Sequence, residues 1–201
     1  MEDTNYNPNY PPHNNGNLSR SELVQKVQQG ANWVNNSGGE RAYFAYEDFS
    51  NKSFGGLDFS HATMALTNCQ GATFSGCNFR EANFRGANLA GADLSGCELS
   101  YVNFAGSILT NVNLTGARLH NTFGNGKEIK NFYIAKFLAS YTSERMVIGC
   151  MDHSIQWYKD CTLADIQDVY NEEDSQHMLD LIKGALTMID LAPCIPVIDN
   201  G

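Results

Sequence analysis

The residues best suited to chemistry form a small group in the carboxyl-terminal part of the chain. Cys150, His153 and Cys161 have the spacing C-x2-H-x7-C, which superficially matches a zinc or redox site. The fourth ligand is not evident, because Cys194 or His177 would have to be brought in by the fold. We therefore favour buried cysteines packed beside a tryptophan, assign no metal ligand, and keep a metal-binding or redox module as a weaker alternative.

Other patterns of catalytic residues are not found in the sequence. The five histidines are scattered over separate segments, and no Ser-His-Asp or paired-carboxylate spacing accompanies them. The glycine-containing stretch GNGK at 124–127 is too short for a phosphate-binding loop and is not followed by Ser or Thr. We expect a protein that is not an enzyme and that uses no cofactor.

The charge of the chain argues against nucleic acid as a direct partner. Among 201 residues, 13 Lys and Arg face 22 Asp and Glu, which gives a net charge of −9. Such a charge repels phosphates. The excess lies in 152–201, with ten acidic residues and two lysines, whereas 40–123 carries seven acidic and five basic residues.

No apolar run approaches the ~20 residues of a membrane span, and the start of the chain lacks the basic and apolar regions of a secretory signal. The expected location is the cytoplasm, with no membrane contact. For a phage-encoded protein this would be the host cytoplasm.

The middle of the chain repeats with a period of five residues. Stepping by five from Phe44 to Leu119 gives sixteen consecutive apolar positions, and many units also carry a small residue two positions earlier and a glycine two positions later. This period fits neither an α-helix nor an alternating strand, so each unit must turn a corner. The expected core is a column of stacked Phe and Leu side chains.

The stretch ANFRGANLAGADLSGCELS resembles the pentapeptide-repeat family, and the resemblance covers 42–121. It implies a right-handed quadrilateral β-helix with four pentapeptides per coil, and thus about four coils. At a strand-like spacing of about 4.8 Å per coil, the helix would be ~20 Å tall.

The segments on either side complete a mainly β fold. We expect a disordered tail at 1–17, an N-terminal capping helix within 18–41, the β-helix over 42–123 and a small α+β C-terminal module at 124–201. Ser19 and Glu22 form a capping-box pattern, and Gly30 is expected to end the first helix near residue 29. This helix, together with Trp33, is predicted to plug the first coil.

In the C-terminal module, IKNFYIA and RMVIG read as strands, and TLADIQDVY and SQHMLDLIKGALTMIDL read as helices. The module also resembles one that accompanies pentapeptide repeats in some bacteriophage and bacterial proteins. That resemblance implies no known activity.

Residues twenty apart should stack on one side of the β-helix, which groups the outward side chains. Tyr43, Tyr46 and Leu66 come together near the base, where we expect the preceding helix to cover them. The most decorated surface gives our candidate protein-binding residues: Arg80, Glu81, Glu98, Tyr101, Arg118 and His120. The terminal helices give a candidate acidic docking surface: Asp165, Asp168, Glu172, Glu173 and Asp174.

These features favour a non-catalytic protein-binding scaffold that occupies a partner protein and inhibits or modulates it. The module resemblance extends this to a phage-type inhibitor of a host nucleic-acid-handling or defence enzyme. The family resemblance implies an alternative, a DNA mimic acting on DNA gyrase or topoisomerase, against which the near-neutral and short repeat segment counts. Homodimerisation through the C-terminal module is a further expectation.

Overall fold

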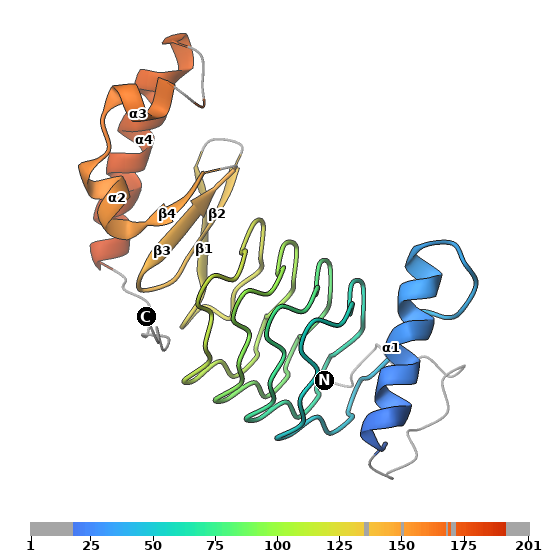
Figure 1. Cartoon of the computed structure of the whole chain (residues 1–201). Helices are drawn as coiled ribbons and strands as arrows, with labels where there is room; N and C mark the ends of the chain where they lie inside the picture. The colour runs from blue at the N-terminus through green and yellow to red at the C-terminus, as the bar shows by residue number, and fades with distance from the viewer. Residues whose placement is uncertain (1–17, 135–136, 150, 168, 170–171, 192–201) are drawn as a thin grey trace, which may run out of the picture.

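The computed structural model describes residues 18–134, 137–149, 151–167, 169 and 172–191. The predicted tail at 1–17 lies outside the described residues. In chain order the fold consists of helix α1 (Arg20–Val34), a stack of four-sided coils, and a unit of sheet and helices at the opposite end (Figure 1). None of the helices in the described ranges combines the length and the apolar composition of a membrane span.

The stack, here called the tower, spans residues 43–123 and is a parallel β-helix. Each bridging residue pairs with the residue twenty positions later, from Tyr43 with Thr63 to Asn103 with Phe123. The four columns of bridges define four faces: face A begins at Tyr43, face B at Asp48, face C at Ser53 and face D at Asp58. Four pentapeptides therefore complete one coil, as the family resemblance implied.

Each corner between two faces is a tight turn. At the first corner the Glu47 amide donates to the Phe44 carbonyl at 3.0 Å, and Tyr46, the second turn residue, has a φ of 66°. A positive φ at this position is the mark of a type II turn. The polar residue at the centre of a face supports the turn, because Asn83 Oδ1 accepts the Arg85 amide at 3.0 Å. The same contact explains the recurring Asn and Asp before each large apolar residue.

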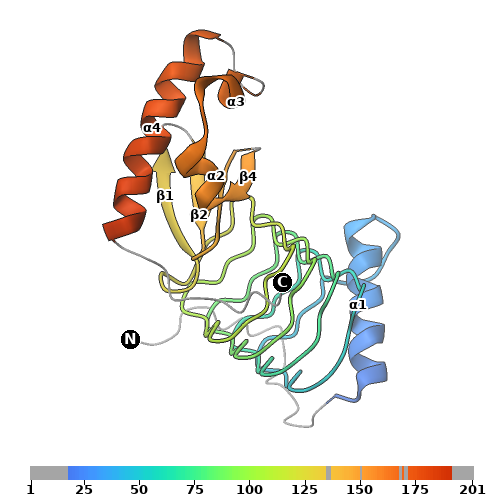
Figure 2. The same cartoon turned by 60° about the vertical axis from the view of Figure 1, so that its left-hand side comes forward.

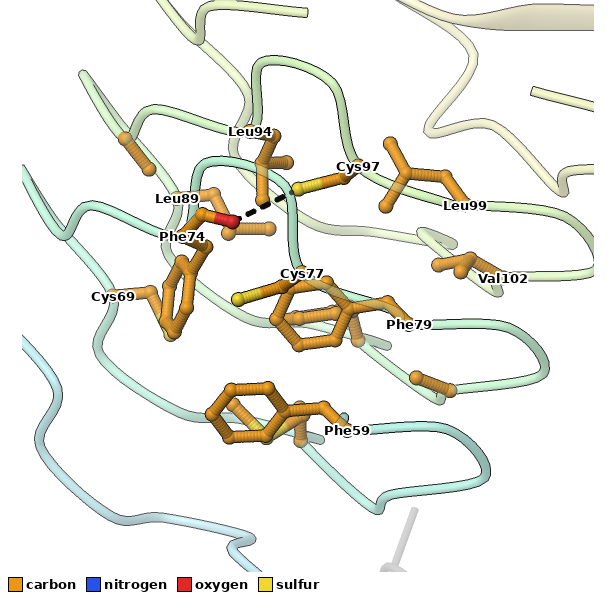
Figure 3. Close-up of a cluster of buried hydrophobic side chains, with 14 of the residues drawn as sticks. Phe59, Cys69, Phe74, Cys77, Phe79, Leu89, Leu94, Cys97, Leu99 and Val102 are labelled. Atoms are coloured by element: carbon orange, nitrogen blue, oxygen red, sulfur yellow. Dashed lines mark hydrogen bonds between the residues drawn. The ribbon is translucent and has the colours of Figure 1, made fainter. Parts of the chain in front are cut away.

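The inside of the tower is filled by the predicted apolar ladder, and all sixteen positions are buried. Phe59 stacks on Phe79 with ring centroids 4.8 Å apart (Figure 3). The thiol of Cys97 donates to the Phe74 carbonyl at 3.1 Å, drawn as the dashed line in Figure 3. Burial raises the pKa of the Cys97 thiol to about 12, so this cysteine is a small core residue.

Helix α1 covers the open end of the first coil but does not stop where the sequence suggested. The prediction that Gly30 ends the helix near residue 29 is wrong, because α1 continues to Val34. Gly30 packs directly on the tower, and a Cβ at this position would lie 2.5 Å from the Cβ of Ala42. The glycine therefore permits close approach of helix and coil, while Leu23 and Val27 join the tower core.

The first coil also presents carbonyl groups that have no coil below them to pair with. Two cationic side chains of α1 bind such groups: Arg20 Nε donates to the Ser53 carbonyl at 3.0 Å, and Lys26 Nζ donates to the Tyr43 carbonyl at 3.4 Å. Within the coil, Lys52 Nζ donates to the Asp48 carbonyl. An unpaired strand edge is a template for aggregation, so these contacts protect the end of the tower.

The C-terminal unit contains an antiparallel meander in the order β1-β2-β3-β4, formed by Lys130–Ile134, Phe137–Tyr141, Arg145–Ile148 and Met151–Ser154. Helices α2 (Ile155–Asp160), α3 (Leu163–Gln167) and α4 (Glu172–Leu191) follow (Figure 2). The predicted strands correspond to β1 and β3, whereas β2, β4 and α2 were not predicted. Helix α3 is shorter than TLADIQDVY, and α4 begins before SQHMLDLIKGALTMIDL.

This unit closes the last coil of the tower. Ile129 and Val147 are buried in the same apolar cluster as the tower residues. Polar contacts lock the junction, because Asn131 Nδ2 and Ser140 Oγ both donate to the Thr122 carbonyl, at 2.7 and 3.0 Å. The tower is thus covered at both ends.

Candidate protein-binding surface

The corners of the tower show where the sequence departs from what the backbone favours. The second turn residue of every repeat has a positive φ, a region in which glycine and asparagine are at ease and other residues cost about 1–2 kcal/mol. Most of these positions are glycine, at 56, 71, 76, 86, 91, 96, 106 and 116, or asparagine, at 51, 111 and 121. Five carry large side chains instead: Tyr46, His61, Leu66, Glu81 and Tyr101.

The five exceptions lie on the two corners that border face A. His61, Glu81 and Tyr101 stack along the corner between faces D and A, here called the D–A corner. Tyr46 and Leu66 occupy the corner between faces A and B. The corner between faces C and D is glycine in every coil. Strain kept at specific positions is typical of functional sites, so this distribution points to one side of the tower.

Side chains on the D–A corner are linked into one array. His61 Nδ1 lies 3.2 Å from Glu81 Oε2, and Arg80 Nε lies 3.5 Å from Glu81 Oε1. The Arg80 guanidinium carbon lies 4.9 Å from the centroid of the Tyr101 ring, in cation–π geometry. Tyr101 is 48% exposed. These contacts restrict the rotamers of the side chains in the array.

Face D carries the remaining candidate residues of this surface. Arg118 Nη1 lies 3.7 Å from Glu98 Oε2, and Glu98 Oε1 accepts the Ser100 amide at 2.9 Å. The His120 carbonyl accepts the Tyr101 amide at 2.9 Å, and its side chain is half-buried. All six candidate residues therefore lie on face D or on the corner beside it.

Trp33 lies in the same region, although the sequence predicted a different role for it. The prediction that Trp33 plugs the first coil is wrong, because Leu23 and Val27 fill that position and Trp33 is 44% exposed. Its ring lies edge-on to His61, with centroids 6.4 Å apart. Between them opens a cavity of about 530 Å³, lined by Trp33, Val34, Asn36, Gly38, Gly39 and His61. In the sequence, only the pair Gly38 and Gly39 after the helix could have indicated this cavity.

The apolar residues at the base are also more exposed than predicted. Tyr46 is 60% exposed and Leu66 is 45% exposed, so α1 does not cover them. Leu66 leans over the next coil, since a Cβ at Gly86 would lie 2.7 Å from Leu66 Cδ2. Tyr43, the third residue of this group, is half-buried.

The candidate acidic surface is only partly described by the structure. Asp165 caps α3, because its Oδ2 accepts from the Thr162 amide at 2.8 Å, and the hydrogen bonds from Thr162 lower the pKa of this carboxyl. Glu172 and Glu173 begin α4, and Asp174 is exposed. Asp168 lies outside the described residues. Asp165 thus has a structural role, because it caps α3.

Of the cysteine and histidine group at 150–161, the structure describes His153 and Cys161, and both make contacts within the C-terminal unit. His153 stacks on Trp157 with ring centroids 3.8 Å apart. The buried Cys161 thiol donates to the Tyr158 carbonyl at 3.2 Å, and burial raises its pKa. Cys150 and Cys194 lie outside the described residues, and elsewhere in the described part of the chain no three His, Cys, Asp or Glu residues gather as metal ligands would.

The repeat itself identifies the fold. The family model of pentapeptide repeats, which contains 8 copies of the repeat, matches three overlapping segments, 48–80, 64–100 and 87–123. Together with four units per coil and parallel bridges twenty residues apart, this decides the assignment. The tower is a pentapeptide-repeat β-helix. No curated protein matches the chain in sequence.

Several solved pentapeptide-repeat structures are similar to the tower. A protein from the thylakoid lumen of Arabidopsis thaliana is 36% identical over 41% of this chain and 58% of its own, with a TM-score of 0.40. HetL, involved in heterocyst differentiation regulation in the cyanobacterium Nostoc, is 27% identical over 43% and 44%, with a TM-score of 0.34. QnrB1, a plasmid-mediated fluoroquinolone resistance protein, is 15% identical over 43% and 49%, with a TM-score of 0.32. The chain spans less than two thirds of the length of each.

Proposed function

We propose that the protein is a non-catalytic binding scaffold that holds a partner protein against face D and the D–A corner of its pentapeptide-repeat tower, and thereby inhibits or modulates that partner. The observation that carries the proposal is the strained column of His61, Glu81 and Tyr101. A tower that needed only to fold would place glycine or asparagine there, as it does on the corners between faces B and C and between faces C and D.

Rigidity makes this surface suited to binding. A side chain held by neighbours loses little conformational entropy when a partner docks, so more of the contact energy appears as affinity. Tyr and Arg are the residue types that most often anchor protein interfaces. Tyr101 and Arg80 meet in a cation–π contact at the centre of the surface, and Arg118 lies on the adjoining face.

A DNA-mimic role receives less support from the tower. Several of its carboxylates are engaged in the turns: Asp48, Asp58 and Asp93 each accept the amide two residues later, at 2.9 to 3.0 Å. Those of Glu81 and Glu98 pair with arginine. A rod that imitates the phosphate field of DNA needs unpaired negative charge along its length. We therefore propose that inhibition of a nucleic-acid-handling enzyme would act through the arginine and tyrosine surface.

Site-specific photo-crosslinking in an extract of the native host tests the proposal. A photo-reactive phenylalanine analogue replaces Tyr101 in one protein and Thr110 in a control, because Thr110 is exposed on the diagonally opposite corner, between faces B and C. We expect a discrete crosslinked protein, identified by mass spectrometry, from position 101 only. The same product from both positions, or none from position 101, would reject the proposed surface.

A further inference from the structure

We propose that the edge of the tower between faces A and B is a self-association surface, on which two copies of the chain pack side by side with their towers antiparallel. This surface, here called the A–B edge, consists of the corner between faces A and B and the outward residues on either side of it. It lies one corner away from the D–A corner, so a second copy bound here leaves the surface proposed for the partner protein open.

Exposed apolar side chains gather on the A–B edge. In the part of the chain that the structure describes, seven large apolar or aromatic residues are exposed, and four of them lie on this edge: Tyr46, Leu66, Ile108 and Phe123. Tyr46 and Leu66 occupy the corner, Ile108 lies on face B and is 51% exposed, and Phe123 lies on face A and is 56% exposed. A cluster of apolar side chains facing water is typical of a protein interaction surface.

All four residues depart from what the backbone alone favours. Tyr46 and Leu66 hold φ values of 66° and 58°, where glycine or asparagine would carry no strain. Ile108 and Phe123 stand at the centre of a face, where Asn103 accepts the amide two residues later at 2.9 Å. An apolar side chain cannot accept this hydrogen bond. The needs of the fold therefore do not account for the four side chains, which points to a function.

The order of these residues along the tower makes the edge complementary to itself. Counted from α1, Tyr46 lies on the first coil, Leu66 on the second and Ile108 on the fourth, and Phe123 begins the fifth turn. A two-fold axis at the level of the third coil places the first coil of one copy beside the fifth turn of the other, and the second coil beside the fourth. The axis also keeps face A of both copies on the same side. Phe123 thus comes to Tyr46 of the other copy, and Ile108 comes to Leu66.

Between the two apolar pairs the corner is narrow. Gly86 and Gly106 take the turn positions of the third and fourth coils, with φ values of 69° and 70°. Leu66 leans over Gly86, since a Cβ on this glycine would lie 2.7 Å from Leu66 Cδ2. The glycines let the backbones of two copies approach closely at the level of the axis.

The charges on the edge set the register and limit the strength of the contact. Exposed Lys127, on the fifth turn, comes opposite Asp48 on the first coil of the other copy. The hydrogen bond from Ser50 holds the pKa of the Asp48 carboxyl below its usual range, with a smaller contribution from Lys52, so this carboxyl is ionised at neutral pH. Exposed Arg85 lies on the third coil, where the axis brings its two copies together, and like charges oppose association.

The contact is small, so the dimer should be reversible. Five coil levels at about 4.8 Å each give a strip ~20–25 Å long and one corner wide. Such a strip buries less than the roughly 800 Å² per partner of a standard interface. We expect a dissociation constant of about 10–100 μM, so the chain is mostly monomeric when dilute. In the dimer both D–A corners lie on one side of the pair, which would present the partner-binding surface twice in the same direction.

Sedimentation velocity of the full chain at increasing concentration tests the inference. We expect a monomer–dimer equilibrium up to about 300 μM, and at least tenfold weaker association for Leu66→Asn. Asparagine tolerates a positive φ better than leucine, so this variant should be at least as stable as the native chain, and unfolding would not explain its loss of association. Tyr101→Asn is the matched control, because it makes the same kind of change on the D–A corner and should leave the dimer unaffected.

Two further variants test the position of the two-fold axis. Arg85→Ala removes the like charges that meet at the axis and should tighten the dimer about three- to tenfold. Under oxidation with copper phenanthroline, Arg85→Cys should form a disulfide between the two copies. Tyr46→Cys should not, because positions 46 of an antiparallel pair are four coils apart, ~19 Å, which is beyond the reach of a disulfide. The native chain, with its own cysteines, is the control for both.

A native chain that stays monomeric at the highest concentration overturns the inference, and the A–B edge would then face another protein or residues 1–17. A dimer that Leu66→Asn leaves unchanged also overturns it, because the contact would lie elsewhere, as on the C-terminal unit. Equal crosslinking of Arg85→Cys and Tyr46→Cys would contradict the antiparallel arrangement. None of these results bears on photo-crosslinking at position 101, since a partner can dock on the D–A corner of a monomer.

Discussion

At the level of single residues, the tower separates positions that maintain the fold from positions that display side chains. Inward residues obey the five-residue pattern at every repeat, and Asn or Asp at the centre of a face supports the next turn. Only at the second turn residue does the sequence accept a conformation that its side chain disfavours. The five-residue pattern predicts the inward residues and the central Asn or Asp from sequence. The conformational cost at the second turn residue becomes evident only once the backbone angles are known.

Tyr101→Asn should leave the free energy of unfolding unchanged or raise it by about 0.5–1 kcal/mol, because asparagine tolerates the left-handed region better than tyrosine. Asparagine already occupies the equivalent position 121 in the next coil, with a φ of 51°. Urea unfolding measures the change. The reciprocal variant is Gly96→Ala. Its Cβ would lie in ordinary van der Waals contact, 3.9 Å from the Gly76 backbone, so the positive φ of 64° alone should cost about 1 kcal/mol. A marked loss of stability in Tyr101→Asn would show that tyrosine serves folding rather than binding.

Leu94→Ala should lower the free energy of unfolding by about 2–5 kcal/mol, since it removes a buried side chain between Phe74 and Leu114 in the ladder. The coils above and below are fixed by parallel hydrogen bonds, so the column cannot collapse into the space. Chemical denaturation gives the number, with Ser95→Ala on the adjacent turn as a control expected within about 0.5 kcal/mol. A loss below half a kcal/mol would contradict the stacking of the ladder.

The tower cysteines should remain protonated and unreactive in the native protein. Burial raises the pKa of Cys69 to about 12 and that of Cys77 to about 11, because an apolar interior disfavours the thiolate. Because the folded pKa exceeds the unfolded value near 8.5–9, this contribution to stability is complete below pH 9 and declines as the pH rises towards 11 and 12. Labelling with a thiol reagent at pH 8, followed by mass spectrometry, should modify these residues only in denaturant; rapid native labelling would contradict their burial.

At the level of elements, the repeat was predictable and the connecting structures were not. A period of five over sixteen units predicts the inward residues and a corner in each unit, and the resemblance to the pentapeptide-repeat family supplied four units per coil. Gly30 was misread because its function is a tertiary contact with Ala42, which local propensity cannot express. Strand β4 and helix α2 are four and six residues long, and their burial is set by packing on α4 and the sheet. The role of Trp33 was also predicted wrongly because its position depends on tertiary packing.

Helix α1 should protect the first coil chiefly through two cations. The double variant Arg20→Ala with Lys26→Ala removes the donors to the Ser53 and Tyr43 carbonyls and leaves those groups at an open strand edge. We expect faster hydrogen exchange in the first coil and concentration-dependent self-association, seen by size-exclusion chromatography. Gln28→Ala, on the exposed side of the same helix, is the matched control. Unchanged exchange and a single elution position for the double variant would contradict the edge-protection role.

At the level of the whole molecule, two candidate binding surfaces lie apart along one elongated body. The D–A corner runs along the tower from His61 in the first coil to Asn121 in the last. The acidic helices α3 and α4 lie beyond the end of the tower opposite α1 (Figures 1 and 2). Binding through the acidic helices would depend on long-range attraction of a basic partner, which salt weakens. Binding through the proposed tower surface would depend more on direct contacts of its Tyr and Arg side chains, which salt affects less.

These differences allow the two surfaces to be distinguished once the crosslinked partner is purified. One variant combines Tyr101→Ala with Arg118→Ala; the other neutralises four acids through Asp168→Asn, Glu172→Gln, Glu173→Gln and Asp174→Asn, and spares Asp165 because it caps α3. Affinity is measured for both at low and high salt.

We expect the tower variant to lose at least tenfold in affinity, since two hot-spot residues at about 1–2 kcal/mol each exceed that factor. The acid variant should change chiefly the association rate at low salt. If the acid variant alone abolishes binding, with a steep salt dependence in the native protein, the partner docks on the terminal helices and the tower serves as their support.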